Sequence, residues 1–162
     1  LRQYLTKFTK EEPRWTPPNK RFLHKRIYLP SMRGETAEIV IGIDTSGSVG
    51  SEELQQFYGE IDNIRRTYRM KLWLIYVDAE VHKVDEINPW DDLQFRPIGR
   101  GGTDFRPLFK EIEKRGISPD VCLFFSDGDG TFPKEGPEYD VLWVLSKGKR
   151  DIPFGDIIVI DD

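Results

Sequence analysis

Five oxygen-bearing side chains, in three short loops far apart in the sequence, could bind one ligand together. They are Asp44, Ser46 and Ser48 in the first loop (44–48, the serine loop), Thr103 in the second (101–104, the Thr103 loop) and Asp127 in the third (126–128). The set offers two carboxylates and three hydroxyls, and the same loops contain no histidine or cysteine, which softer metals would require. Oxygen ligands with few charges suit a hard cation such as Mg²⁺, which takes six oxygens at about 2.0–2.1 Å and keeps several waters. The residue types therefore predict a site for Mg²⁺ or Mn²⁺.

The segments that carry the two carboxylates are expected to place them close together. Residues 38–44 (EIVIGID) and 121–125 (VCLFF) are short and almost wholly apolar, which is typical of strands buried on both faces of a parallel sheet. Asp44 ends the first of these strands, and Asp127 closely follows the other. Neighbouring strands lie about 4.8 Å apart, so the two carboxylates would repel each other unless a cation or a proton lies between them.

The rest of the chain alternates buried strands with amphipathic helices. Further strands, the second of them a short edge strand, are predicted over residues 72–77, 81–87, 141–145 and 156–160. One helix is predicted to start at Ser51 as its cap and to run to Tyr68, and another to span residues 104–115 before Gly116. This order indicates an α/β fold with an open, mainly parallel central sheet flanked by helices. In such sheets ligands bind beyond the carboxyl ends of the strands.

Length and composition suit one globular domain with an N-terminal arm. The chain has 162 residues, of which 38% are hydrophobic and 32% charged, as is ordinary for a soluble protein. No apolar run reaches the roughly 20 residues that span a membrane. Residues 1–36 carry nine lysines and arginines and three acidic residues, whereas residues 37–162 carry fifteen and twenty-five. We expect the basic, proline-containing arm 1–36 to pack on the body 37–162, and the lone Cys122 to be a buried thiol of a cytoplasmic protein.

The loops resemble the metal-ion-dependent adhesion site of von Willebrand factor A-like (vWA-like) domains. Five ligand positions match in three separated segments, in the same order along the chain and with Gly101-Gly102 before the threonine. The resemblance covers roughly residues 37–162 and implies a compact, Rossmann-type version of the fold, without the usual helices before the Thr103 loop and after the third buried strand. Part of the arm, Pro18–Phe22 and Tyr28–Gly34, is similar to a bacterial and phage group that carries an upstream metallopeptidase-like region.

This resemblance implies a role in protein binding rather than catalysis. Asp44, Ser46 and Ser48 would hold the metal from the first loop. Thr103 would coordinate it directly or through water, Asp127 would act through a water, and an Asp or Glu of a partner protein would fill the remaining position. Some members of the group are encoded beside MoxR-type AAA+ ATPases, which by analogy implies an ATPase partner. The activity of the upstream region cannot be carried over, because this chain contains no HExxH motif.

Two other functions remain open on the residues alone. A Mg²⁺-dependent phosphatase or phosphotransferase could use Asp44 as a nucleophile, but enzymes of the haloacid-dehalogenase type need a second aspartate where this chain has Ser46. Nucleic-acid binding through residues 1–36 is the other alternative, although their basic residues are spread among apolar ones and not clustered. The sequence therefore favours a protein partner, and neither nucleic acid nor membrane is expected to bind.

Residues around the loops have more ordinary predicted roles. Asp104 is expected to cap the second helix, Asp129 to be a solvated loop acid, and Trp90 to anchor the long loop 88–102. A further hypothesis is that basic side chains beside the Thr103 loop steer an acidic partner surface toward the metal. These side chains are Arg96, Arg100 and Arg106.

Overall fold

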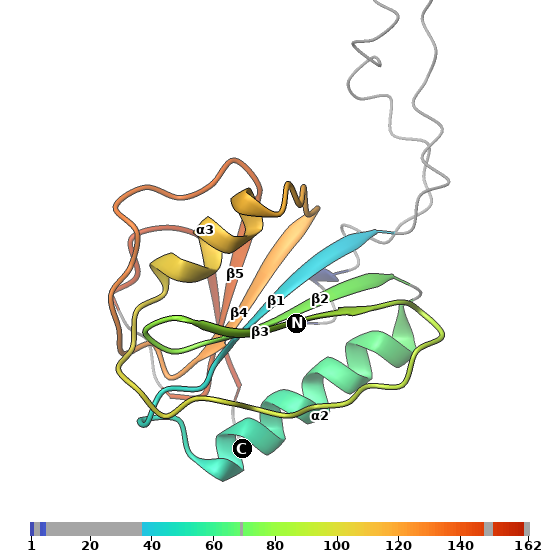
Figure 1. Cartoon of the computed structure of the whole chain (residues 1–162), viewed down its shortest axis with the longest axis horizontal. Helices are drawn as coiled ribbons and strands as arrows, with labels where there is room; N and C mark the ends of the chain where they lie inside the picture. Colours follow the sequence, from blue (N-terminus) through green and yellow to red (C-terminus); the bar gives the residue numbers. More distant parts are fainter. Residues whose placement is uncertain (2–3, 6–36, 69, 148–150, 161–162) are drawn as a thin grey trace, which may run out of the picture.

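The computed structural model describes residues 1, 4–5, 37–68, 70–147 and 151–160, and in this part of the chain six strands form one sheet (Figure 1). The strands follow the order β3-β2-β1-β4-β5-β6 across the sheet. Their bounds are β1 Glu38–Asp44, β2 Lys71–Val77, β3 Val81–Ile87, β4 Val121–Ser126, β5 Asp140–Leu145 and β6 Asp156–Val159. All neighbouring pairs are parallel except β2 and β3, which are antiparallel and leave β3 at the edge. The predicted α/β fold with an open, mainly parallel sheet is confirmed.

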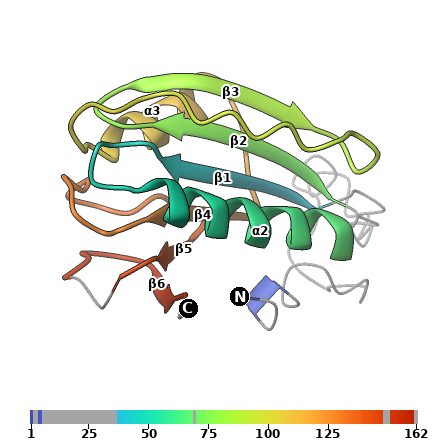
Figure 2. The ribbon, with the colours of Figure 1, turned by 90° about the horizontal axis from the view of Figure 1, so that it is seen from below.

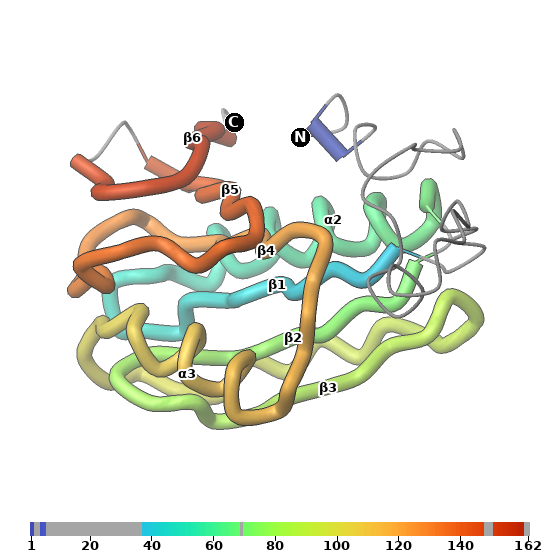
Figure 3. The backbone as a smooth tube through the Cα atoms, turned by 90° about the horizontal axis from the view of Figure 1, so that it is seen from above, coloured from blue at the N-terminus to red at the C-terminus, as the bar shows by residue number. Residues whose placement is uncertain are grey.

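Two helices cover opposite faces of this sheet. Helix α2 (Ser51–Thr67) lies nearest the viewer in Figure 2 and helix α3 (Arg106–Lys114) in Figure 3, which shows the sheet from the other side. Side chains alternate between the faces, as the pleat of a strand requires. On β1, Ile41 packs in the cluster under α2, whereas Val40 packs in the cluster under α3. Both faces are covered, so the central strands are buried throughout, as their apolar sequences predict.

The helix ends differ slightly from the prediction. Gly50, not Ser51, is the N-cap of α2, with extended backbone, and its N–H donates to Glu53 Oε2 at 2.6 Å. The carboxylate three residues on thus supplies one half of a capping box, and Gly50 has no side chain to supply the other half. Helix α3 is shorter than the predicted span 104–115, but Gly116 follows it with a φ of +65°, as predicted for a glycine that ends a helix.

The long segment 88–105 between β3 and α3 contains no helix and crosses the α2 side of the sheet (Figure 2). Phe95 holds it there, because its ring lies 5.4 Å from that of Tyr58 on α2 and 5.9 Å from that of Tyr76 on β2. Trp90 is 80% exposed, so the prediction that it anchors this loop is wrong. The backbone near Trp90 is held instead by Arg65, whose Nη1 donates to Asp91 O at 3.0 Å.

The predicted arm falls mostly outside the described residues. Of residues 1–36 the structure describes Leu1, Tyr4 and Leu5, which pack against the cluster under α2, with Leu5 fully buried. Cys122 is buried on β4, and burial raises the pKa of its thiol well above the ordinary range. In the described part of the chain no helix combines the length and the apolar character needed to cross a bilayer.

Candidate metal centre

The two predicted carboxylate ligands follow neighbouring strands. Strands β1 and β4 pair in parallel, with Ile43 opposite Phe125. Asp44 at the end of β1 therefore lies beside Ser126 at the end of β4, and Asp127 comes one residue later. The prediction that both carboxylates occupy the carboxyl edge of adjacent strands is confirmed, with the refinement that Asp44 and Asp127 are staggered by one position.

Asp44 is fully buried, and hydrogen bonds engage both of its oxygens. The Ser46 backbone N–H donates to Oδ1 at 2.9 Å, and Ser126 Oγ donates to Oδ2 at 2.6 Å. Burial raises the pKa of Asp44, and the nearby charge of Asp127 adds to the rise. The hydrogen bonds from Ser126 and Ser46 act in the opposite direction. A buried carboxyl with a second carboxylate close by is a position that a cation would stabilise.

The two serines of the first loop present their hydroxyls side by side. Ser46 Oγ and Ser48 Oγ lie 3.1 Å apart. Ser46 is 2% exposed, whereas Ser48 is exposed, so the pair leads from the buried carboxylate to the surface. A ligand held by both hydroxyls would thus have one side open to a partner.

Ser126 is a residue of this site that the sequence prediction missed. Its Oγ accepts the Gly128 N–H at 2.9 Å while donating to Asp44, so it links the first loop to the third. Asp127 is 3% exposed, and its Oδ1 accepts the Asp129 N–H at 3.0 Å. Asp129 itself is exposed, as predicted for a solvated acid. The only sequence signal for Ser126 was its place at the end of a buried strand.

The backbone of the loop that carries Thr103 is bonded to the loops of the other predicted ligands, while the Thr103 side chain makes no hydrogen bond with the described residues. Thr131 N donates to Thr103 O at 3.3 Å, and a Cβ on Gly130 would lie 2.6 Å from Thr103 Cγ2. The Thr103 methyl group therefore packs against the loop that follows Asp127. On the other side, Gly47 N donates to Gly101 O at 3.2 Å, which joins the Thr103 loop to the serine loop.

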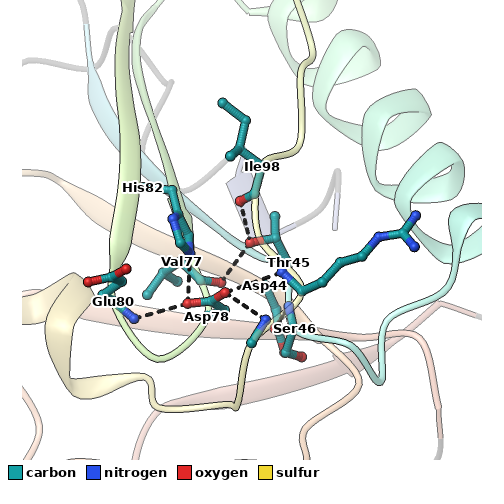
Figure 4. Close-up of polar contacts among 10 residues, drawn as sticks. Asp44, Thr45, Ser46, Val77, Asp78, Glu80, His82 and Ile98 are labelled. Carbon is teal, nitrogen blue, oxygen red and sulfur yellow. Dashed lines mark hydrogen bonds and ion pairs between the residues drawn. The ribbon is translucent and has the colours of Figure 1, made fainter.

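A third carboxylate, Asp78, holds the Thr103 loop in place, and the predicted site did not include it. Asp78 is 3% exposed at the end of β2. Its Oδ2 accepts the N–H groups of Gly101 at 2.9 Å and Arg100 at 3.3 Å, and its Oδ1 accepts the Glu80 N–H at 3.1 Å (Figure 4). His82 Nε2 lies 2.7 Å from Oδ1, although the ring N–H is not well directed at it.

Ionisation of Asp78 is strongly favoured by these donors. Burial alone would raise its pKa, but the hydrogen bonds from Gly101, Glu80 and Arg100, together with the close approach of His82, outweigh burial and hold the pKa well below the usual range. The carboxylate is thus a fixed charge whose donors come mainly from the backbone of the glycine-rich loop. A signal was present in the sequence, because Asp78 follows a buried strand as Asp44 does.

Thr45 fastens the same loop from the side of β1. Its Oγ1 donates to Ile98 O at 2.9 Å, and its N–H donates to Val77 O at 2.8 Å (Figure 4). Gly99 has a φ of +145°, and a Cβ there would collide with Thr45 Oγ1. Only glycine can take this conformation so close to Thr45 without strain.

The charged residues beside the Thr103 loop separate into two groups. The predicted cap Asp104 is not the N-cap of α3, which is Phe105, but Asp104 precedes it and its Oδ1 accepts the N–H of Arg106, the first residue of the helix, at 3.0 Å. Its carboxylate also binds the Arg106 guanidinium at 2.7 Å, so the hypothesis that Arg106 is free to steer a partner is wrong. Arg96 and Arg100 are exposed, and neither forms an ion pair with the described residues.

The donors that meet at this edge fit a hard cation. Within the described ranges no three His, Cys, Asp or Glu side chains gather as a ligand cluster. The predicted set never required one, because Asp44 and Asp127 are its only carboxylates and the other donors are hydroxyls. Burial and, to a smaller extent, the charge of Asp127 raise the pKa of Asp44, and a cation between the two carboxylates would offset both effects. Asp44, Ser46, Ser48 and Asp127 are brought together, and Thr103 stands on a loop fastened to both of their loops.

Comparison with known proteins agrees with this architecture. Residues 39–161 match the family described as VWA-like domain (DUF2201). A Thermotoga maritima protein described as "Uncharacterized protein" is 32% identical over 152 residues, which cover 91% of this chain and 36% of the relative. This chain therefore spans well under two thirds of that relative's length. The vWA-like resemblance is confirmed at the level of the family, while the metal and the upstream region stay predictions. The chain belongs to the VWA-like domain family DUF2201.

Proposed function

We propose that this chain is a protein-interaction module whose contact with its partner is completed by a divalent metal ion, Mg²⁺ or Mn²⁺. The ligands in this proposal are Asp44, Ser46, Ser48, Thr103 and Asp127. A carboxylate of the partner fills the position that remains. The observation that carries the proposal is the convergence of three loops at one sheet edge, with two carboxylates and paired hydroxyls at their centre.

The chain's own residues prepare this contact. The bound metal would supply a positive charge that binds the partner's carboxylate. Ser126 and the Ser46 N–H hold the Asp44 carboxylate in a fixed orientation, so its geometry is set before any ligand arrives. Exposed Ser48 marks the side that faces solvent, where a partner can approach. Asp78 keeps the Thr103 loop against the serine loop.

An enzyme that uses Asp44 as its nucleophile finds less support. Asp44 is fully buried, which leaves little room for a substrate in line with its carboxylate, whereas a metal ion can bind an oxygen that already accepts one hydrogen bond. Ser46 occupies the position of the expected general acid, and a hydroxyl is a poor acid. Protein binding without catalysis therefore remains our proposal.

Calorimetric titration of Mg²⁺ and Mn²⁺ into the metal-free chain tests the metal directly. We expect one ion to bind the wild type, and no ion to bind Asp44→Asn. Asp129→Asn is the matched control, because Asp129 is exposed in the same loop as Asp127 and is not a proposed ligand. Equal affinity in the wild type and Asp44→Asn would refute the assignment.

The partner's identity is proposed on the resemblance alone. A MoxR-type AAA+ ATPase is the expected partner, and a cytoplasmic location remains a prediction of the sequence. Mixing the chain with such an ATPase in magnesium and in chelator, followed by size-exclusion chromatography, tests the pair. Nucleic-acid binding would depend on the basic arm 1–36, most of which lies outside the described residues.

A further inference from the structure

An apolar groove borders the proposed metal face. It has a volume of about 410 Å³ and lies between the first half of α2 and the segment that follows Phe95. Its walls are Ser51, Leu54, Gln55, Tyr58, Phe95 and Pro97. The α2 members recur at helical spacing, so they form one stripe along the helix. Glu52 and Glu53 lie off that stripe, which leaves the groove without an acidic lining residue.

Both walls of the groove run into the metal loops. On the helix side, Ser51 comes three residues after the proposed ligand Ser48. On the loop side, Pro97 precedes Ile98, whose carbonyl accepts the Thr45 hydroxyl at 2.9 Å. The groove and the metal loops are thus parts of one continuous surface, and a short ligand segment can reach both.

Exposed apolar side chains gather at this groove. Three large hydrophobic residues of the described chain are markedly exposed, and two of them, Tyr58 at 37% and Ile98 at 50%, lie in the groove or at its rim. The third, Trp90, is near the other end of α2, beside the Arg65 contact with Asp91. An exposed apolar patch beside a polar site is typical of an interaction surface.

The charge around the groove favours an acidic ligand. Arg96 and Arg100 flank the exposed Ile98 in sequence, and their guanidinium groups form no ion pair with the described residues. Of the two acids of α2 beside the groove residues in sequence, Glu53 is engaged by Lys147 at 3.0 Å and Glu52 is exposed, so two arginines face one uncompensated acid. A segment that carries a negative charge and an apolar side chain could therefore bind the arginines with the one and the groove with the other.

We propose that the groove binds a bulky apolar side chain of the same partner segment whose Asp or Glu reaches the metal. This inference rests on the proposed function and specifies its partner as an acidic–apolar motif. From Ser51 to Tyr58 the helix rises about 10 Å at 1.5 Å per residue. An extended segment covers about 3.3 Å per residue. The apolar residue is then roughly two to four positions from the acid.

Selection of short random peptides with one fixed Asp, on the full chain in magnesium chloride, tests this motif. The selected peptides should share a large apolar residue at a constant offset from the fixed Asp. Changing that residue to Ala, or making Tyr58→Ser in the protein, should weaken binding about ten- to hundredfold, as expected for the loss of one buried side chain. Combining both changes should cause little further loss, because they remove the same contact.

Two further protein variants serve as a control and as a second test of the groove. Trp90→Ser is the matched control, because it also removes an exposed aromatic side chain, and it should bind the peptides as the wild type does. Gln55→Trp fills the groove with a bulky uncharged side chain from an exposed position, so the fold is kept, and it should weaken binding as Tyr58→Ser does.

Three outcomes would overturn the inference. Magnesium-dependent peptides that show no apolar preference, or that bind Tyr58→Ser normally, would remove the groove from the contact and leave the proposed metal function standing. Peptides whose binding needs Tyr58 but survives chelation would refute the metal-dependent function and, with it, the joint motif. A lower sedimentation mass of free Tyr58→Ser than of the wild type would assign the groove to a second copy of the chain.

Discussion

Replacing Asp78 by Asn changes a buried carboxylate that fastens the Thr103 loop, and its effect can be worked out from the contacts. Asp78 offers two charged acceptors to three backbone N–H groups, those of Gly101, Arg100 and Glu80. Asn keeps the shape but has one acceptor oxygen and no charge, so one or two of these groups lose their partner. A buried donor left without an acceptor costs about 1–3 kcal/mol, and bonds to a charged group contribute about 1.5–3 kcal/mol. We expect the free energy of unfolding to fall by about 2–4 kcal/mol.

Urea denaturation at neutral pH measures this loss. The matched control is Asp85→Asn on β3, which removes a partly exposed ion pair with Lys83 at 2.7 Å. Such a pair contributes about 0–1 kcal/mol, so the control should stay close to the wild type. Hydrogen exchange should also become faster at the amide of Gly101 in Asp78→Asn. A loss no larger than that of the control would refute the role of Asp78 in holding the loop.

The pH dependence provides a second check on Asp78. Its folded-state pKa is depressed below the unfolded value of about 3.9. Its contribution is therefore complete above the unfolded pKa and is lost as the pH falls through the folded value. The difference in free energy of unfolding between the wild type and Asp78→Asn should be constant from about pH 7 to pH 5 and should become smaller below about pH 4. If this difference stays constant in strong acid, the charge of Asp78 is not what stabilises the wild type.

Further changes near the site have definite expected results. Gly99→Ala should lower the free energy of unfolding by about 1–3 kcal/mol through overpacking and backbone strain, whereas Gly102→Ala, where an added Cβ meets nothing within 4 Å, should be nearly neutral in the same denaturation assay. Ser126→Ala should cost about 1–3 kcal/mol, because it removes the hydroxyl bound to buried Asp44, and an unchanged urea midpoint would count against that bond. Arg100→Glu should slow association with an acidic partner at low salt in stopped-flow mixing, and this difference should fade at high salt; an equal rate at low salt would end the steering hypothesis.

The sequence was a good guide to the elements and to the first loop. Apolar runs in the sequence predict buried strands, and Asp44 at the end of such a run could be placed at the end of β1 from the sequence alone. Alternation of strands and helices limited the topology to a parallel sheet, which brought Asp127 to the same edge. These are local or rule-based features, so the pattern along the chain was sufficient to predict them.

Errors in the prediction arose where the environment, not the residue, decides. Trp90 is the kind of residue that anchors loops, yet it is 80% exposed, because Phe95 takes the place between α2 and β2. Arg106 was counted as a free charge, but Asp104 two positions earlier neutralises it. Such outcomes depend on which neighbours the folded chain brings into contact, and the spacing of residues in the sequence does not give that information.

By itself the sequence determined the α/β class, the order of the strands along the chain and the oxygen-rich chemistry of the three loops. Only the tertiary structure decided that Ser126 bridges Asp44 to the third loop, that Asp78 and Thr45 hold the Thr103 loop, and that an apolar groove adjoins the site. The reason is physical: residue types fix which bonds a side chain can make, but a buried polar atom bonds to whichever group the packed sheet brings within about 3 Å.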